Sequence, residues 1–293
     1  MAISAAQVKE LRERTGLGMM ECKAALVETD GNMEAAIDVL RKKAGAKVEK
    51  KAHRIAAEGA IGLYVSEAGD VGALVEINSE TDFVAKEDRF IGLAQTLAEL
   101  VAKKNPADVE ALMALPVAQG GTVAEQRAAL IAQFGENMSI RRFVRMTADG
   151  GQLGHYVHGR KIGVLIRMTG GNATLARDLA MHIAASRPQY VQPGDVPADV
   201  MEREKAIYVA QAEESGKPRE IVEKMVMGKV KKYLDDISLV GQPFVKDPET
   251  TVAEQLKRAK AVATGFYRLE VGEGIEREAS NFASEVMSQV QGT

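Results

Sequence analysis

Residues 78–86 place a carboxylate beside a large aromatic ring, directly after a predicted strand. The two side chains are Asp82 and Phe83, and only 4% of the chain is aromatic, which makes a ring in a polar loop unusual. One interpretation is structural: Thr81 or Asp82 caps a following helix, and Phe83 packs into the core. The other is functional: the loop presents the ring at the rim of a domain, where aromatic side chains often anchor protein–protein contacts. The spacing leaves both interpretations open.

Signatures of covalent chemistry are missing from the sequence. It contains no GxxxxGK[ST] phosphate loop, no HExxH zinc motif and no EF-hand pattern. The four histidines lack the spacing of metal ligands on one helix, and the single cysteine, Cys22, excludes an intramolecular disulfide. We therefore expect no catalytic residue, no metal and no cofactor. A small-molecule enzyme that uses Asp82 with a histidine as acid and base is an alternative, and it predicts turnover without any protein partner.

The charge balance bears on the class of partner. The chain has 38 basic and 41 acidic residues, whereas a nucleic-acid-binding protein usually has a basic excess, so we expect no specific nucleic-acid ligand. Residues 41–54 are an exception, with seven Lys or Arg and a single acidic residue, Glu49. RNA or ribosome binding through this stretch is the main alternative function, and it predicts binding that weakens steeply with salt. Because no secretory signal and no apolar run of about 18 residues is present, we expect a cytoplasmic protein that does not contact a membrane.

Hydrophobic periodicity and turn residues predict an α+β fold built from several modules. Residues 1–44 form a three-helix module, in which Ser4 and Gln7 begin the first helix, and residues 45–56 form a basic linker. An internal repeat follows: residues 62–65 and 154–157 each begin a β-hairpin, which leads to a helix and then to a closing strand. The repeat predicts two related core subdomains with small antiparallel sheets, at residues 57–146 and 147–274. The second contains an inserted pair of helices at about 195–235, and residues 275–293 form a terminal amphipathic helix.

Several motifs together resemble the bacterial elongation factor Ts family over essentially the whole chain. They are Leu11 to Gly16, Met19 to Lys23, Thr81-Asp82-Phe83-Val84-Ala85, Gly135-Glu136-Asn137, Ile140-Arg141-Arg142, His158-Gly159, Met181 to Ala185 and Gly241 to Phe244. The resemblance implies a ubiquitin-associated-like (UBA-like) N-terminal module. It also implies that the inserted helices form a coiled-coil arm, which in the family is sometimes linked to self-association.

The same resemblance implies a guanine-nucleotide exchange factor for the GTPase elongation factor Tu, binding both its GDP-bound and its nucleotide-free form. By that analogy, the segment from Thr81 through Asp82 and Phe83 to Val84 disturbs the Mg²⁺ site of the GTPase, and Phe83 enters between two of its helices. The remaining implied contacts come from the C-terminal helix and from Arg12, Met19, Met20 and His158. The first three residues and the helix hold the nucleotide domain, and His158 touches the other end of the GTPase.

Overall fold

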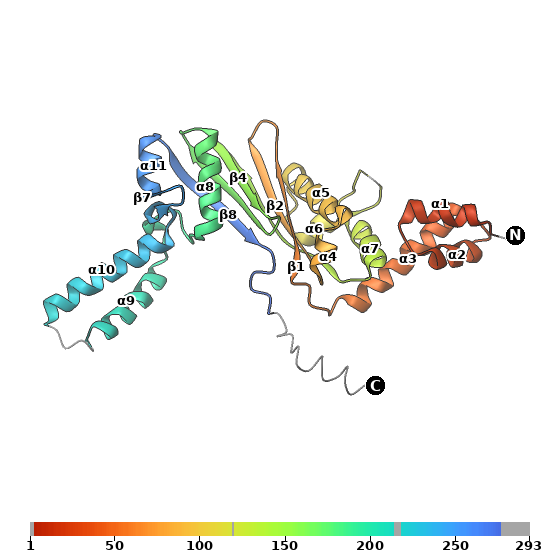
Figure 1. Cartoon of the computed structure of the whole chain (residues 1–293), viewed down its shortest axis with the longest axis horizontal. Helices are drawn as coiled ribbons and strands as arrows, with labels where there is room; N and C mark the ends of the chain where they lie inside the picture. The colour runs from red at the N-terminus through yellow and green to blue at the C-terminus, as the bar shows by residue number, and fades with distance from the viewer. Residues whose placement is uncertain (1–2, 119, 214–217, 277–293) are drawn as a thin grey trace.

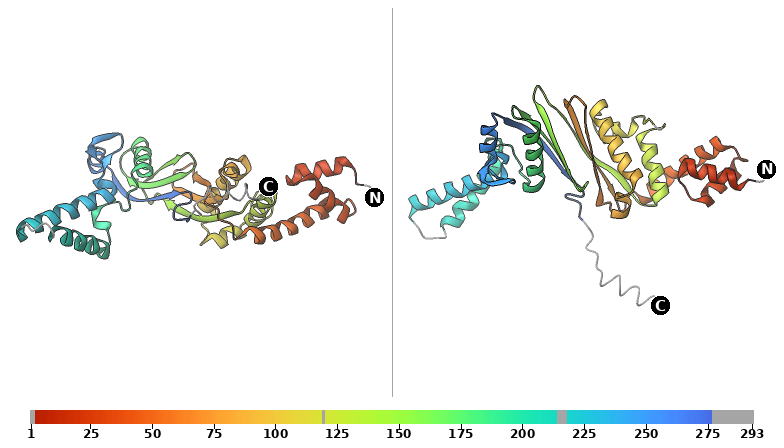
Figure 2. Two further views of the ribbon diagram at one scale, coloured as in Figure 1. Left: turned by 60° about the horizontal axis from the view of Figure 1, so that its bottom comes forward. Right: turned by 45° about the horizontal axis from the view of Figure 1, so that its top comes forward.

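The computed structural model describes residues 3–118, 120–213 and 218–276, and it shows an elongated molecule (Figure 1). Three helices form one end, a pair of helices forms the other, and two small antiparallel sheets lie between them; Figure 2 shows the same order from two further directions. The predicted α+β class is confirmed.

The N-terminal end is a small helical bundle with its own core. Its helices are α1 (Ala5–Thr15), α2 (Met19–Glu28) and α3 (Met33–Lys51). Ser4 and Gln7 form the predicted capping box, and α1 ends at Gly16 with a left-handed φ of 73°, which glycine adopts without strain. Leu11, Cys22 and Leu26 are fully buried among the three helices, so Cys22 has the packing role typical of a buried thiol.

Helix α3 extends beyond the predicted end of the module at residue 44 and continues to Lys51. Ala44 is buried, and Val48 packs against the core of the first sheet. Because tertiary packing covers one side of this basic stretch, most of the expected linker is helical. The connection that remains before the first strand spans residues 52–57.

The two sheets have the same strand order and similar helical covers. The first contains β1 (Glu58–Val65), β2 (Val71–Ser79) and β3 (Met138–Thr147), and the second contains β4 (Gln152–His158), β5 (Ile162–Thr169) and β8 (Val262–Glu270). In each sheet the second strand in sequence is central and pairs antiparallel with both neighbours. Helix α5 (Asp88–Lys104) packs on the first sheet and α8 (Ala173–Ser186) on the second. Two shorter helices, α6 (Val109–Ala114) and α7 (Val123–Phe134), complete the first core.

The faces that these helices leave uncovered pack against each other. Leu74 from β2 and Leu165 from β5 are fully buried in this shared layer, and Ile61 and Leu269 beside them are buried almost completely. The approach is close, because a Cβ atom at Gly163 would lie 2.5 Å from Cγ2 of Ile61. The absence of a side chain at this glycine therefore lets the two sheets meet.

The far end contains α9 (Ala198–Glu213) and α10 (Arg219–Ile237), which pack against each other through Ala212, Val222 and Val226. A short 3₁₀ turn, η1 (Pro193–Asp195), precedes α9. After α10 the chain returns to the second sheet through a second 3₁₀ turn, a two-stranded hairpin and one helix, which are η2 (Leu239–Gly241), β6 (Pro243–Phe244), β7 (Asp247–Thr251) and α11 (Val252–Arg258). The predicted terminal helix at 275–293 lies outside the described residues from 277 onward. Within the described ranges, no helix is long and apolar enough to cross a membrane.

His182 on α8 is fully buried, and hydrogen bonds fix its neutral form. Its Nδ1 accepts from the amide of Val245 at 3.2 Å, so Nε2 carries the proton and donates to Oε1 of Gln242 at 2.9 Å. Burial lowers the pKa of His182 below its ordinary 6.5, opposed by the bond to Gln242. The β6–β7 hairpin is thereby attached to α8 by a neutral imidazole.

Candidate partner-binding site

Phe83 is the most exposed large apolar side chain of the described residues, at 77%. It lies on α4 (Asp82–Ala85), a single helical turn that follows β2 directly and whose first amides are capped by Thr81, with its Oγ1 3.4 Å from the Val84 amide. Val84 and Ala85 face inward and are buried. The structural interpretation is therefore right about the cap and wrong about Phe83, because Val84 and Ala85 fill the core position and turn the ring outward.

A carboxylate from a distant part of the chain holds the start of this turn. Glu136 accepts hydrogen bonds from both the backbone amide and the hydroxyl of Thr81, at 3.0 and 2.7 Å. The carbonyl of Thr81 accepts from the hydroxyl of Ser79 at 2.9 Å. All the polar groups of Thr81 are thus engaged, which fixes the direction in which Phe83 points. This role of Glu136 was not predicted from the sequence, in which Glu136 stood out only as part of the Gly135-Glu136-Asn137 motif.

A second set of contacts ties the same loop to the segment that follows α3. Glu80 accepts a hydrogen bond from the Asn137 amide at 2.5 Å and lies 3.5 Å from Arg54. The side-chain amide of Asn137 in turn donates to the carbonyl of Arg54 at 2.7 Å. Arg54, predicted only as one charge of a basic linker, therefore helps to anchor the loop.

Asp82 forms an ion pair with Lys86 one turn later, at 2.5 Å. The hydrogen bond from Lys86 is the main reason that the pKa of Asp82 lies below its usual value, so the carboxylate is ionised. The ammonium of Lys86 also lies 6.0 Å from the centre of the Phe83 ring. The enzyme alternative requires a histidine beside Asp82, and the structure places a lysine there.

The N-terminal bundle presents further apolar side chains. Met19 and Met20, at the start of α2, are 55% and 75% exposed, and Arg12 on α1 is also exposed. Val27, seven residues after Met20 and so on the same helical face, is 58% exposed and was not predicted from the sequence as a contact residue. The bundle is set against the first subdomain: α3 packs on α7, and a side chain at Gly16 would collide with Arg89 at the start of α5.

His158 ends β4 and is exposed, with its Nδ1 3.2 Å from the hydroxyl of Tyr156. The turn that follows is fastened to β1, because the Ile61 amide donates to the carbonyl of Arg160 and Lys161 pairs with Glu58 at 2.6 Å. Glu58 is the register partner of Ser79, the last residue of β2. His158 and Phe83 therefore lie at the same end of the two sheets, whereas Arg12, Met19 and Met20 belong to a separate helical bundle.

The basic stretch at residues 41–54 is largely engaged within the chain. Four of its seven cationic side chains have partners: Lys43 with Glu28, Lys47 with Glu21, Lys51 with the carbonyl of Gly135, and Arg54 with Glu80. This internal pairing disfavours the alternative in which the stretch binds RNA or the ribosome.

The architecture and these exposed residues define an α+β protein that presents apolar side chains from a rigidly held loop and from a helical bundle. The family model described as "Elongation factor TS" matches residues 80–273. Elongation factor Ts of Alkalilimnicola ehrlichii and that of Thioalkalivibrio sulfidiphilus are each 56% identical to this chain over 293 residues, covering all of both chains. Elongation factor Ts of Methylococcus capsulatus is 52% identical over 291 residues, covering 99% of each chain. The chain belongs to the elongation factor Ts family.

Proposed function

We propose that this protein is a guanine-nucleotide exchange factor in translation elongation. It binds elongation factor Tu in its GDP-bound and nucleotide-free forms and promotes release of GDP by disturbing the Mg²⁺ and phosphate site. It acts in the cytoplasm and carries out no covalent chemistry of its own. Membership of the elongation factor Ts family supports this proposal, and the observation that carries it is the exposed ring of Phe83 on a loop held by Glu136 and Glu80.

In this proposal the four loop residues, Thr81 to Val84, have different roles. Phe83 enters between two helices of the GTPase and displaces the elements that support its Mg²⁺ ion, while Asp82 fixes the loop through its ion pair with Lys86. Thr81 and Val84 act by positioning, since Thr81 caps the turn and Val84 is buried beneath it. A translation GTPase holds its diphosphate through Mg²⁺ and backbone amides, so a small displacement of either weakens its grip on GDP.

Phe83 alone supplies too little energy for exchange. Shifting a GTPase from 1:99 to 99:1 in favour of the nucleotide-free complex requires a differential of about 5.5 kcal/mol. Burying one Phe contributes about 1.5–3 kcal/mol. The rest must come from contacts elsewhere, and because linkage is reciprocal, rebinding of nucleotide loosens these contacts by the same factor.

We assign those contacts to the regions that the family resemblance indicates. The UBA-like bundle, with Arg12, Met19 and Met20, holds the nucleotide domain together with the C-terminal helix, and His158 contacts the other end of the GTPase. The subdomains at 57–146 and 147–274 carry the loop and His158, respectively. The helix pair α9–α10 forms a coiled-coil arm that is available for self-association.

The direct test is stopped-flow release of a fluorescent GDP analogue from elongation factor Tu, with and without this protein. We expect the release rate to rise with the concentration of the protein and then to saturate. The chase nucleotide alone, and the protein after heat unfolding, are the controls. Release that stays at its intrinsic rate in the presence of folded protein would refute the proposal.

A further inference from the structure

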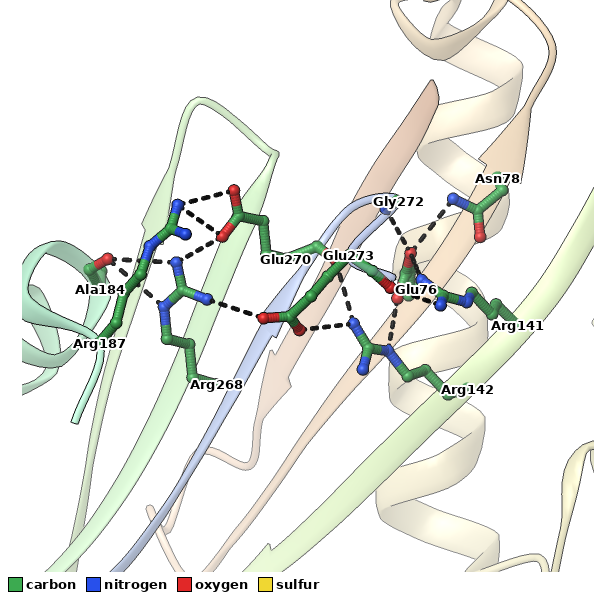
Figure 3. A network of polar contacts seen from close by, with 10 residues as sticks. All are labelled: Glu76, Asn78, Arg141, Arg142, Ala184, Arg187, Arg268, Glu270, Gly272 and Glu273. Atoms are coloured by element: carbon green, nitrogen blue, oxygen red, sulfur yellow. Dashed lines mark hydrogen bonds and ion pairs between the residues drawn. The ribbon is translucent and has the colours of Figure 1, made fainter. Parts of the chain in front are cut away.

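Glu76 is a fully buried carboxylate at which four separate donors meet (Figure 3). Arg141 and Arg142 of β3 approach its two oxygens at 3.0 and 2.6 Å. The backbone amide of Gly272, just after β8, donates to it at 2.8 Å, and the side chain of Asn78 donates at 3.2 Å. Burial alone would raise the pKa of Glu76, but the bonds from Gly272, Arg142 and Arg141 hold its pKa below the usual value. The carboxylate is therefore charged, and its negative charge is balanced by donors from both sheets: the two arginines of the first sheet and the Gly272 amide that follows the second.

A β-bulge makes this arrangement possible. Adjacent side chains of a strand normally point to opposite faces, so two consecutive arginines do not usually reach one carboxylate. Between β2 and β3 the register shifts after Glu76: Glu76 pairs with Arg142 and Ile77 pairs with Ile140, which leaves Arg141 as the extra residue. Because the bulge redirects Arg141, both guanidinium groups lie on the side where Glu76 and the second sheet meet.

The cluster extends across the boundary between the two sheets. Arg142 also bonds to Glu273 at 3.1 Å and to the carbonyl of Glu270 at 3.1 Å, and Arg141 donates to the carbonyl of Glu273 at 2.5 Å. On the far side, Glu270 pairs with Arg268 and with Arg187, the C-cap residue of α8 (Figure 3). The end of β8 is thus fixed to β3 by charge, in addition to the apolar layer between the sheets.

Glu76 also lies on the strand that leads into the Phe83 loop. Asn78, two residues later, links Glu76 to the carbonyl of Glu58 at 3.1 Å, and Glu58 holds Lys161 in the turn after His158. Four residues after Glu76, Glu80 begins the anchored loop. One buried carboxylate therefore connects the base of this loop, the His158 turn and the end of the second sheet.

We propose that Glu76 is a positioning residue for nucleotide exchange. It holds the second sheet at a fixed position relative to β2. When the GTPase binds on the His158 side, this rigid connection presses the Phe83 ring into the GTPase. Without it, the binding energy would be spent on movement between the two sheets. The inference rests on the function proposed above. Its physical basis is that a contact accelerates a reaction only when its geometry is held precisely. A misplacement of about 1 Å reduces the rate by up to about 100-fold.

The test is the maximal rate of GDP release at saturating protein, measured for Glu76→Gln. The substitution keeps the size of the side chain, removes the charge and turns an amide group toward one of the guanidinium donors. We expect the maximal rate to fall about 10-fold. The matched control is Glu270→Gln, which alters the same cluster without touching β2, and we expect it to release GDP at the rate of the unmodified protein.

A purely structural role is separated from positioning by a double-mutant cycle with Phe83→Ala. If Glu76 acts through the loop, removal of the ring slows release less in the Glu76→Gln background than in the original protein. A Glu76→Gln variant with a lower melting temperature, yet a full maximal rate while folded, would overturn the inference and leave the exchange function intact. If that variant does not fold, Arg142→Lys, which keeps the charge and loses the two-pronged geometry, takes its place under the same criteria. If the unmodified protein does not accelerate release, the exchange function fails, and this inference fails with it.

Discussion

Replacing Phe83 with alanine separates the role of the ring in binding from its role in the fold. The side chain is 77% exposed, so the free protein has little packing to lose, and we expect its stability to change by less than about 0.5 kcal/mol. Full burial of a Phe is worth about 1.5–3 kcal/mol, and the exposed three-quarters therefore corresponds to about 1–2 kcal/mol. If the ring is buried in the transition state for GDP release, its loss slows release about 5- to 30-fold.

The assay is stopped-flow release of a fluorescent GDP analogue, with thermal unfolding of each variant in parallel. Met227→Ala is a matched control, because this side chain is 72% exposed and belongs to α10, a helix at the opposite end of the molecule from the N-terminal bundle (Figure 1). We expect both variants to unfold near the original temperature and only Phe83→Ala to be slow in exchange. A folded Phe83→Ala protein with an unchanged release rate would refute the wedge, and a large loss of stability would show that the ring serves the fold instead.

Three further predictions concern the anchor, the helical bundle and the buried histidine. Glu136→Gln keeps one acceptor for Thr81 and loses the charge, so we expect exchange to slow by a factor corresponding to about 1 kcal/mol with little change in melting temperature; equal rates would contradict the positioning role. Met20→Ala should raise the half-saturating concentration about 5-fold and leave the maximal rate unchanged, measured by titration of the same reaction. Because the folded-state pKa of His182 is lowered, the stability it contributes is complete above the unfolded value of 6.5 and is lost as the pH falls toward the folded value. The urea unfolding midpoints at pH 7.5 and pH 5.5 should therefore lie closer together in His182→Gln than in the exposed control His53→Gln. The same pH dependence of the midpoint in both variants would contradict the lowered pKa of His182.

The class of fold was predictable because it depends on local patterns. The hairpins of both sheets follow from apolar runs separated by turn residues, and Ser4 followed by Gln7 predicts the capping box of α1. The end of α3 was not predictable in the same way. Alanine and lysine favour a helix as readily as a solvated tether, and what decides the outcome is packing of α3 against α7, which is remote in sequence.

The candidate loop shows the same limit. Its position after a strand and its capping threonine could be predicted, but the direction of Phe83 could not, because one helical turn can bury any of its residues. Burial of Val84 and Ala85 decides the matter. Glu136 lies 55 residues beyond Thr81 in the chain, so no local pattern reveals their contact. The Gly135-Glu136-Asn137 motif marked Glu136 as part of a family block, but it did not indicate which residue Glu136 contacts.

The anchors support the proposed role of the exposed Phe83 ring in binding. A flexible loop would lose conformational entropy when it bound its partner, at a cost of about 0.5–1.5 kcal/mol for each side chain that becomes ordered. That cost would offset much of the roughly 1–2 kcal/mol that burial of the ring supplies. In this protein the polar groups of Thr81 are already engaged and Glu80 is already held, so the ordering takes place on folding. The same reasoning applies to the joint between the sheets, where Glu76 fixes the loop relative to His158 before any partner arrives. Weak contacts at separate places can then add in one complex, because the geometry between them is set in advance.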